Sequence, residues 1–250
     1  MISYRNKILL IDITIIALFL LIWEIFSSHD IINSFIFSSP SKMINSLYTL
    51  LLNGNLLGHI LTTLKEILLS FSLGIAISFL LSIILYYNKF IRDIVDPFLT
   101  MLNSLPKVAL GPIIIIWAGA NTNSIILMAV LTNAIVSTIT ISNIFVNTDK
   151  LKIKLFKSFN ASNFQILFGL IIPSNLSNII SSLKVNISLT LIGVIMGEFL
   201  VSKKGLGYLI LYGTQIFDLN IVMGCLLILI IISYILYKLI VLIEKRQLNN

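Results

Sequence analysis

This sequence of 250 residues is poor in charged residues and contains a single cysteine. Only 11% of its residues are charged, against 58% hydrophobic, which excludes a soluble globular domain of ordinary composition. The one cysteine, Cys225, lies inside an apolar run and excludes an intrachain disulfide or a cysteine metal cluster. The two histidines, His29 and His59, are far apart and have no thiol or carboxylate pattern beside them. The sequence therefore predicts no metal site.

Catalytic motifs are also missing. The sequence has no His-Glu-x-x-His, no Gly-x-Ser-x-Gly and no phosphate-binding Gly-x-x-x-x-Gly-Lys-Ser/Thr. We therefore expect a protein that is not an enzyme and holds no cofactor, so that a partner supplies any energy-yielding chemistry. The net charge of +7 is scattered over several loops, which argues against nucleic-acid binding.

Long apolar runs dominate what is present. A run of about 20 residues is long enough to cross a hydrocarbon core of about 30 Å. Six such spans are predicted, over residues 8–26, 67–87, 95–119, 124–146, 179–201 and 221–243. We expect an all-α polytopic membrane protein with one domain, residues 1–250. Residues 27–66 are expected to form a mixed linker, with one or two helical pieces lying on the membrane.

The third predicted span is interrupted. Pro97, Pro106 and Pro112 fall within it, and Lys107 lies in its middle. Proline removes a backbone donor and clashes with the preceding turn, so this span is expected to kink or split. Such breaks persist at membrane depth where neighbouring protein or a water-filled cavity satisfies the freed backbone groups.

Basic residues predict the orientation. With the N-terminus in the cytoplasm, the outer segments hold only Lys42, Lys65, Lys203 and Lys204. The inner segments then hold a larger set: Arg5, Lys7, Lys89, Arg92, Lys150, Lys152, Lys154, Lys157, Lys245 and Arg246. This excess predicts that both termini lie in the cytoplasm. The interval 150–174 then faces the cytoplasm too.

That interval contains the largest cytoplasmic segment. Leu151, Leu155 and Phe159 recur every four residues with Phe156 beside them, and lysines fall on the opposite side. The spacing predicts a short helix with one apolar and one basic face. A turn over residues 160–163 and an apolar run that stops at Pro173 follow. By itself the helix could lie on lipid as well as dock on a protein.

Further residues support a family resemblance by their order and spacing. They are Asp96-Pro97, Leu105-Pro106 with Ala109 and Pro112, Trp117-Ala118-Gly119, Asn160-Ala161-Ser162, Leu170, Ile172-Pro173, Glu198 and Gly205-Leu206-Gly207. Together they resemble the permease subunits of binding-protein-dependent ABC importers, of the nitrate, taurine and alkanesulfonate group. The resemblance extends from Ser38 to the C-terminus and implies a type I importer permease fold.

The sequence departs from the family pattern in its cytoplasmic loop. The Glu-Ala-Ala of the family is replaced by Lys154, Leu155 and Phe156, and its glycine by Asn160. Asparagine tolerates a left-handed backbone better than most residues, so the turn is expected to survive. If the family carboxylate contacts the ATPase, this chain must make that contact in another way.

The resemblance implies partners and site residues. Two copies would form a homodimer in the cell membrane, with the pathway at their interface. A cytoplasmic ABC ATPase would bind the ATP, and an extracytoplasmic binding protein would deliver the solute. The residues implied in ATPase contact are Leu151, Lys154, Leu155, Phe156, Phe159, Asn160, Ala161, Ser162 and Pro173.

A pathway or gate role is predicted for Pro106, Pro112 and Glu198. Ionisable residues within spans are commonly functional, although Glu198 lies near the end of its apolar run and could instead reach the outer interface. Both prolines also have a purely structural reading, as the cause of the helix break.

The expected solute is a small anion such as nitrate, a sulfonate or taurine, and the alternative is a thiamine-precursor pyrimidine or another small nitrogenous compound. Two other functions stay open. An ion-coupled secondary transporter would show inverted repeats and broken helices in both halves, and only one broken span is predicted here. A membrane scaffold that transports nothing would agree with the altered cytoplasmic loop.

Overall fold

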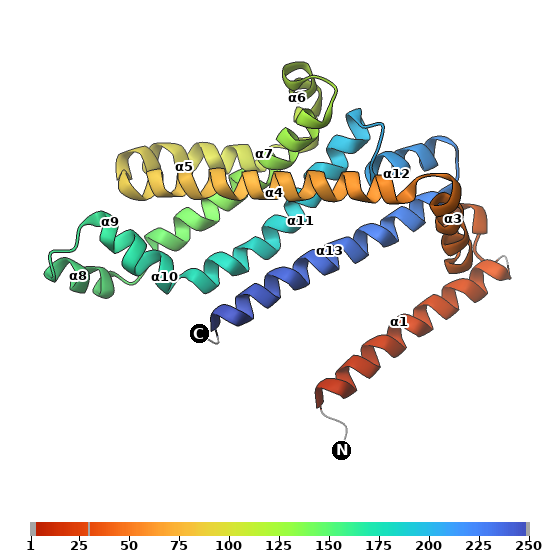
Figure 1. Ribbon diagram of the computed structural model, residues 1–250, viewed down its shortest axis with the longest axis horizontal. Helices are drawn as coiled ribbons and strands as arrows, with labels where there is room; N and C mark the ends of the chain where they lie inside the picture. Colours follow the sequence, from red (N-terminus) through yellow and green to blue (C-terminus); the bar gives the residue numbers. More distant parts are fainter. Residues whose placement is uncertain (1–3, 30, 249–250) are drawn as a thin grey trace.

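The computed structural model describes residues 4–29 and 31–248, and every regular element in that part of the chain is a helix or helical turn (Figure 1). In chain order they are α1 (Tyr4–Ser28), α2 (Ser34–Phe37), α3 (Pro40–Asn53), α4 (Leu56–Tyr87), α5 (Lys89–Ser104), the 3₁₀ turn η1 (Lys107–Leu110), α6 (Gly111–Ala118), α7 (Thr122–Val146), α8 (Lys150–Ser158), α9 (Asn163–Ile166), the π-helical turn η2 (Leu167–Ile171), α10 (Ile172–Ser174), α11 (Leu176–Val201), α12 (Leu206–Gln215) and α13 (Leu219–Leu248). The predicted all-α fold class is confirmed.

In the described part of the chain, four helices are long and apolar enough to cross a membrane. They are α4, α7, α11 and α13, with mean hydropathies of 2.5, 2.0, 1.8 and 2.8 over their most apolar windows. A fifth crossing is possible where α5 and η1–α6 form one apolar pair bent by 93°. The break after Ser104 confirms the predicted interruption.

Helix α1 contains the whole of the predicted first span, residues 8–26. It has 25 residues, but its described apolar part, Thr14–Ser28, is shorter than the other four spans. A sixth crossing therefore stays a prediction. The side chains of Arg5 and Lys7, which count toward the predicted orientation, lie outside the described residues. In Figure 1 the start of α1 and the end of α13 point to the same side, as an even number of crossings requires.

Helix α7 lies at the centre of the bundle, between α4 and α11. Small residues let the backbones approach closely: a Cβ at Gly193 would lie 2.5 Å from Cα of Ala129, and one at Gly197 would lie 2.8 Å from Cα of Ile125. This use of small residues is typical of helix contacts in membranes, where van der Waals packing replaces the hydrophobic effect.

Buried polar side chains link the same three helices. Asn133 Nδ2 donates to Thr190 Oγ1 at 3.0 Å, and Ser137 Oγ donates to Asn133 Oδ1 at 2.6 Å. Ser78 Oγ lies 3.0 Å from the carbonyl oxygen of Ala134. Hydrocarbon offers no hydrogen-bonding partners, so these groups must pair inside the bundle.

Helix α1 is separate from this bundle and packs on α2 and α3 (Figure 1). The Glu24 carboxylate accepts from the backbone nitrogen of Ser41 at 2.9 Å and from its hydroxyl at 2.7 Å. Ser27 Oγ donates to the carbonyl oxygen of Ser38 at 2.9 Å. These bonds attach α1 to the start of α3 at the end far from α8.

The predicted linker over residues 27–66 is partly wrong. Its two helical pieces exist as α2 and α3, but α4 begins at Leu56 rather than at Ile67. Lys65, counted as an outer-loop charge, therefore lies within a helix. Sequence hydropathy missed the first turns of α4 because Thr63 and Glu66 are polar. In the structure both side chains are buried against neighbouring helices.

Candidate functional site

The segment predicted to face the cytoplasm folds as predicted, into a short helix and a turn. Asp149 begins α8, since its Oδ1 accepts from the backbone nitrogen of Leu151 at 2.8 Å. Asn160 has a φ of +55°, a left-handed conformation that asparagine tolerates. Ser162 then caps α9 through a reciprocal pair of bonds with Gln165. The altered loop therefore keeps the turn that the family glycine would provide.

The faces of α8 differ from the prediction. Ile153 and Phe156 turn inward and pack on a cluster of buried residues that includes Phe145 and Ile171. Phe156, predicted as an ATPase contact, is therefore half-buried in the chain itself. The prediction also missed Ile153, because two apolar rows on a nine-residue helix give no sign of which row is buried.

The remaining apolar row points outward. Leu151 is 74% exposed, Leu155 54% and Phe159 76%. Lys154, in the place of the family glutamate, is exposed on the same helix. An exposed apolar strip of this kind marks an interaction surface.

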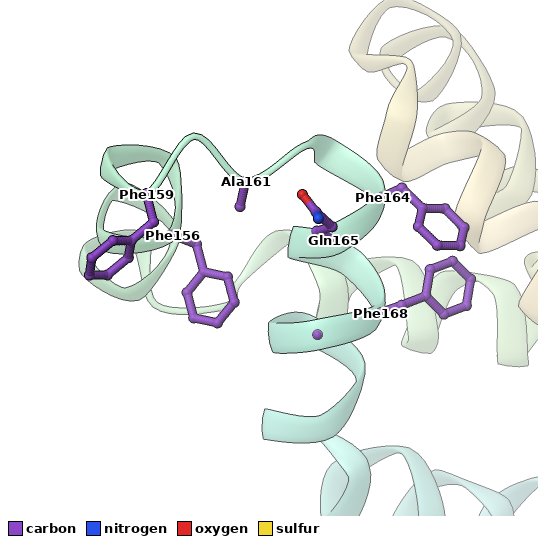
Figure 2. Close-up of a pocket in the computed structure, with 7 residues that line it drawn as sticks. Phe156, Phe159, Ala161, Phe164, Gln165 and Phe168 are labelled. Atoms are coloured by element: carbon purple, nitrogen blue, oxygen red, sulfur yellow. The ribbon is translucent and has the colours of Figure 1, made fainter.

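An open hollow of about 680 Å³ adjoins this strip. Figure 2 shows Phe156 and Phe159 at the end of α8 and Ala161 in the loop, with Phe164 of α9 and Phe168 of η2 on the side away from α8. The rings of Phe164 and Phe168 lie 4.5 Å apart, measured between centroids. Aromatic residues from α8, α9 and η2 thus line this hollow.

The segment connects to the spanning helices through Pro173 and Asn175. Pro173 lies in the first turn of α10, where its missing N–H costs least. The apolar run stops there as predicted, with Ser174 and Asn175 following, but the chain stays helical and leads into α11 at Leu176. Asn175 Nδ2 donates to Thr148 Oγ1 at 2.8 Å and to the carbonyl oxygen of Ile171 at 2.9 Å. The end of α7 and the start of α11 are thereby joined behind α8.

Pro106 and Pro112 both lie at the broken helix. Pro106 precedes η1 and Pro112 lies in the first turn of α6. Neither proline lines the adjacent hollow of about 220 Å³, which Lys107 and Thr132 border among apolar side chains. Lys107 Nζ donates to the carbonyl oxygen of Asn103 at 2.9 Å. The positions of the prolines agree with a structural role in forming the bend.

Glu198 is fully buried rather than at an outer interface. Its Oε1 accepts from Thr63 Oγ1 at 2.6 Å, and its Oε2 accepts from the backbone nitrogen of Gly207 at 2.5 Å. Glu66 is buried next to it. The sequence analysis did not associate Thr63 and Glu66 with Glu198, and no sequence motif joins them. Among the described residues, no group of three His, Cys, Asp or Glu side chains could hold a metal ion.

Comparison with known proteins agrees with this arrangement. Residues 71–249 match the family described as the inner membrane component of binding-protein-dependent transport systems. The chain is 30% identical over 230 residues to a probable ABC transporter permease of Haemophilus influenzae, which covers 92% of this chain and 93% of that protein.

Two further relatives have more specific descriptions. The putative aliphatic sulfonates transport permease SsuC of Bacillus subtilis is 26% identical, over 93% of this chain and 84% of its own. The formylaminopyrimidine transport permease ThiX of Halalkalibacterium halodurans is 29% identical, over 76% of this chain and 75% of its own.

The fold resembles that of a chain in an inward-facing MetNI methionine ABC transporter, with a TM-score of 0.70 and 17% identity over 77% of this chain and 95% of that one. The family match covers well over half of this sequence, and the 30% identity extends along nearly all of it. This chain therefore belongs to the family of inner membrane components of binding-protein-dependent transport systems, and it is a multi-pass permease subunit of an ABC importer.

Proposed function

We propose that two copies of this chain form the pathway of an ATP-driven importer, and that α8 docks on its ATPase. The observation that carries the proposal is the exposed apolar strip of Leu151, Leu155 and Phe159, beyond the ends of the spanning helices. Family membership itself implies an ABC ATPase and a substrate-binding protein as partners. The ATPase performs the ATP chemistry, and this chain is not an enzyme.

The packing of α8 supports docking on a protein. Its inward face already holds Ile153 and Phe156 against the bundle, so a force on α8 reaches the buried cluster directly. Asn175 and Thr148 join the two spanning helices behind it. A partner that moves α8 would therefore move α7 and α11 together.

Lys154 defines what the partner surface must carry. It is exposed near the apolar strip, in the position where the family has a glutamate. We infer an apolar groove on the ATPase with an acidic residue at the place that meets Lys154, because opposite charges across an interface favour the right partner. A partner selected for this chain then differs in charge from that of its relatives.

The test uses the chain with its own ATPase and binding protein in liposomes. Leu155→Asp together with Phe159→Asp is expected to abolish assembly with the ATPase and stimulated ATP hydrolysis. Lys154→Glu should weaken assembly at least tenfold, although it restores the family residue. Lys152→Glu is the matched control and should leave assembly within a factor of two or three. Equal assembly of all variants would refute docking through α8.

The solute we propose is a small anion of the sulfonate kind. Lys107 borders the hollow at the broken helix among mainly apolar side chains, which suits one anionic group. The similarity to the formylaminopyrimidine permease supports a pyrimidine as the second candidate. Stimulation of ATP hydrolysis by the binding protein loaded with each compound separates them, and Lys107→Gln should reduce stimulation by the anion alone.

The homodimer is part of this proposal because the resemblance to importer permeases implies two copies with the pathway at their interface. The native mass of the purified assembly is expected to equal two copies of this chain and two ATPase subunits. A mass that fits a single copy, or a second kind of permease chain in the purified complex, would refute it.

A further inference from the structure

A buried polar cluster lies at the end of the bundle opposite α8, where α4, α11 and α12 meet (Figure 1). We call Thr63, Glu66, Glu198, Leu206 and Gly207 the outer cluster. Its residues come from two spanning helices and from the turn that begins α12. The side chains of Thr63, Glu66 and Glu198 are all at most 2% exposed.

Within the outer cluster Glu198 acts only as an acceptor. Its two oxygens accept hydrogen bonds, one from the hydroxyl of Thr63 and one from the backbone N–H of Gly207. Thr63 Oγ1 in turn accepts from the backbone nitrogen of Leu206 at 2.8 Å. A Cβ at Gly205 would overlap the Glu198 carboxyl, so the turn fits closely around this group. One carboxylate thus holds the start of α12 against α4 and α11.

Glu66 lies beside this carboxylate, and no described group donates a hydrogen bond to it. Both of its oxygens are buried and lack a hydrogen-bonding partner among the described groups, while its carboxyl interacts with that of Glu198. Two ionised carboxylates can only accept hydrogen bonds and repel each other. An uncompensated buried charge of this kind is strongly unfavourable.

No cation forms an ion pair with either carboxyl among the described residues, although Lys65 is near enough to interact with Glu66 electrostatically. The ion pairs found there are Arg92 with Asp93 and Lys184 with Glu244, both elsewhere. Lys203 and Lys204 are exposed and border an outer hollow of about 510 Å³ with Glu66, but neither forms an ion pair with it. The titratable groups around the pair are His59, Lys65, Lys203, Lys204, Tyr208 and Cys225.

We propose that the Glu66–Glu198 pair is a proton-binding site. One proton resides on Glu66, whose O–H donates to Glu198. The proton removes one of two buried charges and converts a contact between two acceptors into a hydrogen bond. Glu198 keeps its charge and its bonds to Thr63 and Gly207. The proton is therefore required for α12 and its preceding loop to stay attached to α4 and α11.

Loss of this proton at alkaline pH loosens the outer cluster. The loop that carries Lys203 and Lys204 is then released from the bundle at the face where solute enters. His59 contacts the same loop, since its Nδ1 accepts from the backbone nitrogen of Gly205 at 3.0 Å. The same Nδ1 lies 3.2 Å from the carbonyl oxygen of Gly205, so a protonated Nδ1 donates to that oxygen in place of the lost bond. His59 therefore keeps its contact with the loop at acid pH, and the alkaline loosening belongs to the carboxyl pair.

The direct test is infrared spectroscopy of the complete transporter in nanodiscs. A protonated carboxylic acid has a C=O stretching band that a carboxylate lacks. The band is expected in the wild type at neutral pH and should be absent from Glu66→Gln. Glu24→Gln is the matched control, because Glu24 accepts two donors from Ser41 and is already ionised. It should leave the band unchanged.

Thermal unfolding supplies the second readout. The unfolding midpoint of the wild type should fall as pH rises, and that of Glu66→Gln should stay constant over the same range. An amide at position 66 donates to Glu198 without a titratable proton, whereas Glu66→Ala should unfold earlier at every pH. No protonated band in the wild type would overturn the proposal. So would stabilisation of the wild type by sodium or calcium ions with no dependence on pH, which would mean a cation site.

Discussion

Replacement of Thr63 by valine tests the central connection of the outer cluster. Valine has nearly the shape of threonine, so Thr63→Val leaves no cavity and removes only the hydroxyl. That hydroxyl donates to Glu198 and accepts from the backbone nitrogen of Leu206. Both contacts are lost together, and the N–H of Leu206 stays buried without a partner.

The magnitude follows from those two losses. A hydrogen bond to a charged group contributes about 1.5–3 kcal/mol, and an unpaired buried N–H costs about 1–3 kcal/mol. Polar contacts between membrane helices contribute less, about 0.6 kcal/mol on average, since unfolded helices also find partners in the membrane. We therefore expect the free energy of unfolding to fall by about 3 kcal/mol.

The assay is equilibrium unfolding in mixed micelles with increasing SDS, followed by circular dichroism. Thr62→Val is the matched control, one residue away on α4, because its hydroxyl donates only to the carbonyl oxygen of Gly58 in the same helix. It should change the free energy of unfolding by no more than about 0.5 kcal/mol. If both variants unfold at the same SDS fraction as the wild type, the outer cluster does not hold α12 in place.

Three further substitutions test other contacts. Gly193→Val should destabilise the bundle by more than about 3 kcal/mol, because the new side chain would meet the backbone of α7. Gly169→Ala should be neutral, since the nearest atom to its new Cβ is 3.8 Å away. SDS unfolding measures both variants. Asn160→Val should cost about 1–2 kcal/mol at its φ of +55° and lower the yield of ATPase complex, while Asn160→Gly should equal or exceed the wild type. Asn175→Ala removes the bond to the end of α7 and should cost about 1 kcal/mol; reduced ATPase stimulation with assembly intact would reveal its part in transmission, and an unchanged ratio of hydrolysis to assembly would contradict it.

The spanning helices could be predicted because hydropathy responds to length and composition. Residues 124–146, 179–201 and 221–243 each lie within a long helix that the structure confirms. The start of α4 could not be predicted, since its polar residues face protein rather than lipid and so interrupt the apolar run. Pro106 predicted the break between α5 and α6. The bend of 93° could not be predicted, because it depends on packing against other helices and not on the proline alone.

The candidate site was predictable in its local geometry only. Asp149, Asn160 and Ser162 fix the ends of α8 and α9 through short-range bonds, and these follow from residue type. Which face of α8 is buried depends on Phe145 and Ile171, which approach from elsewhere in the chain. The pairing of Glu66 with Glu198 is likewise invisible in sequence, because it forms only when α4 and α11 pack together.

The central position of α7 has a consequence for how the protein is made. Asn133 on α7 finds its amide partner, Thr190, on α11, which leaves the ribosome 57 residues later. During synthesis α7 thus enters the membrane before the acceptor of the Asn133 Nδ2 group, on α11, has been made. Helix α4, already inserted, contacts the same asparagine through Gly74 and can shelter it from lipid. The order of helices along the chain therefore sets an order of assembly, in which α4 and α7 form a pair that α11 later completes.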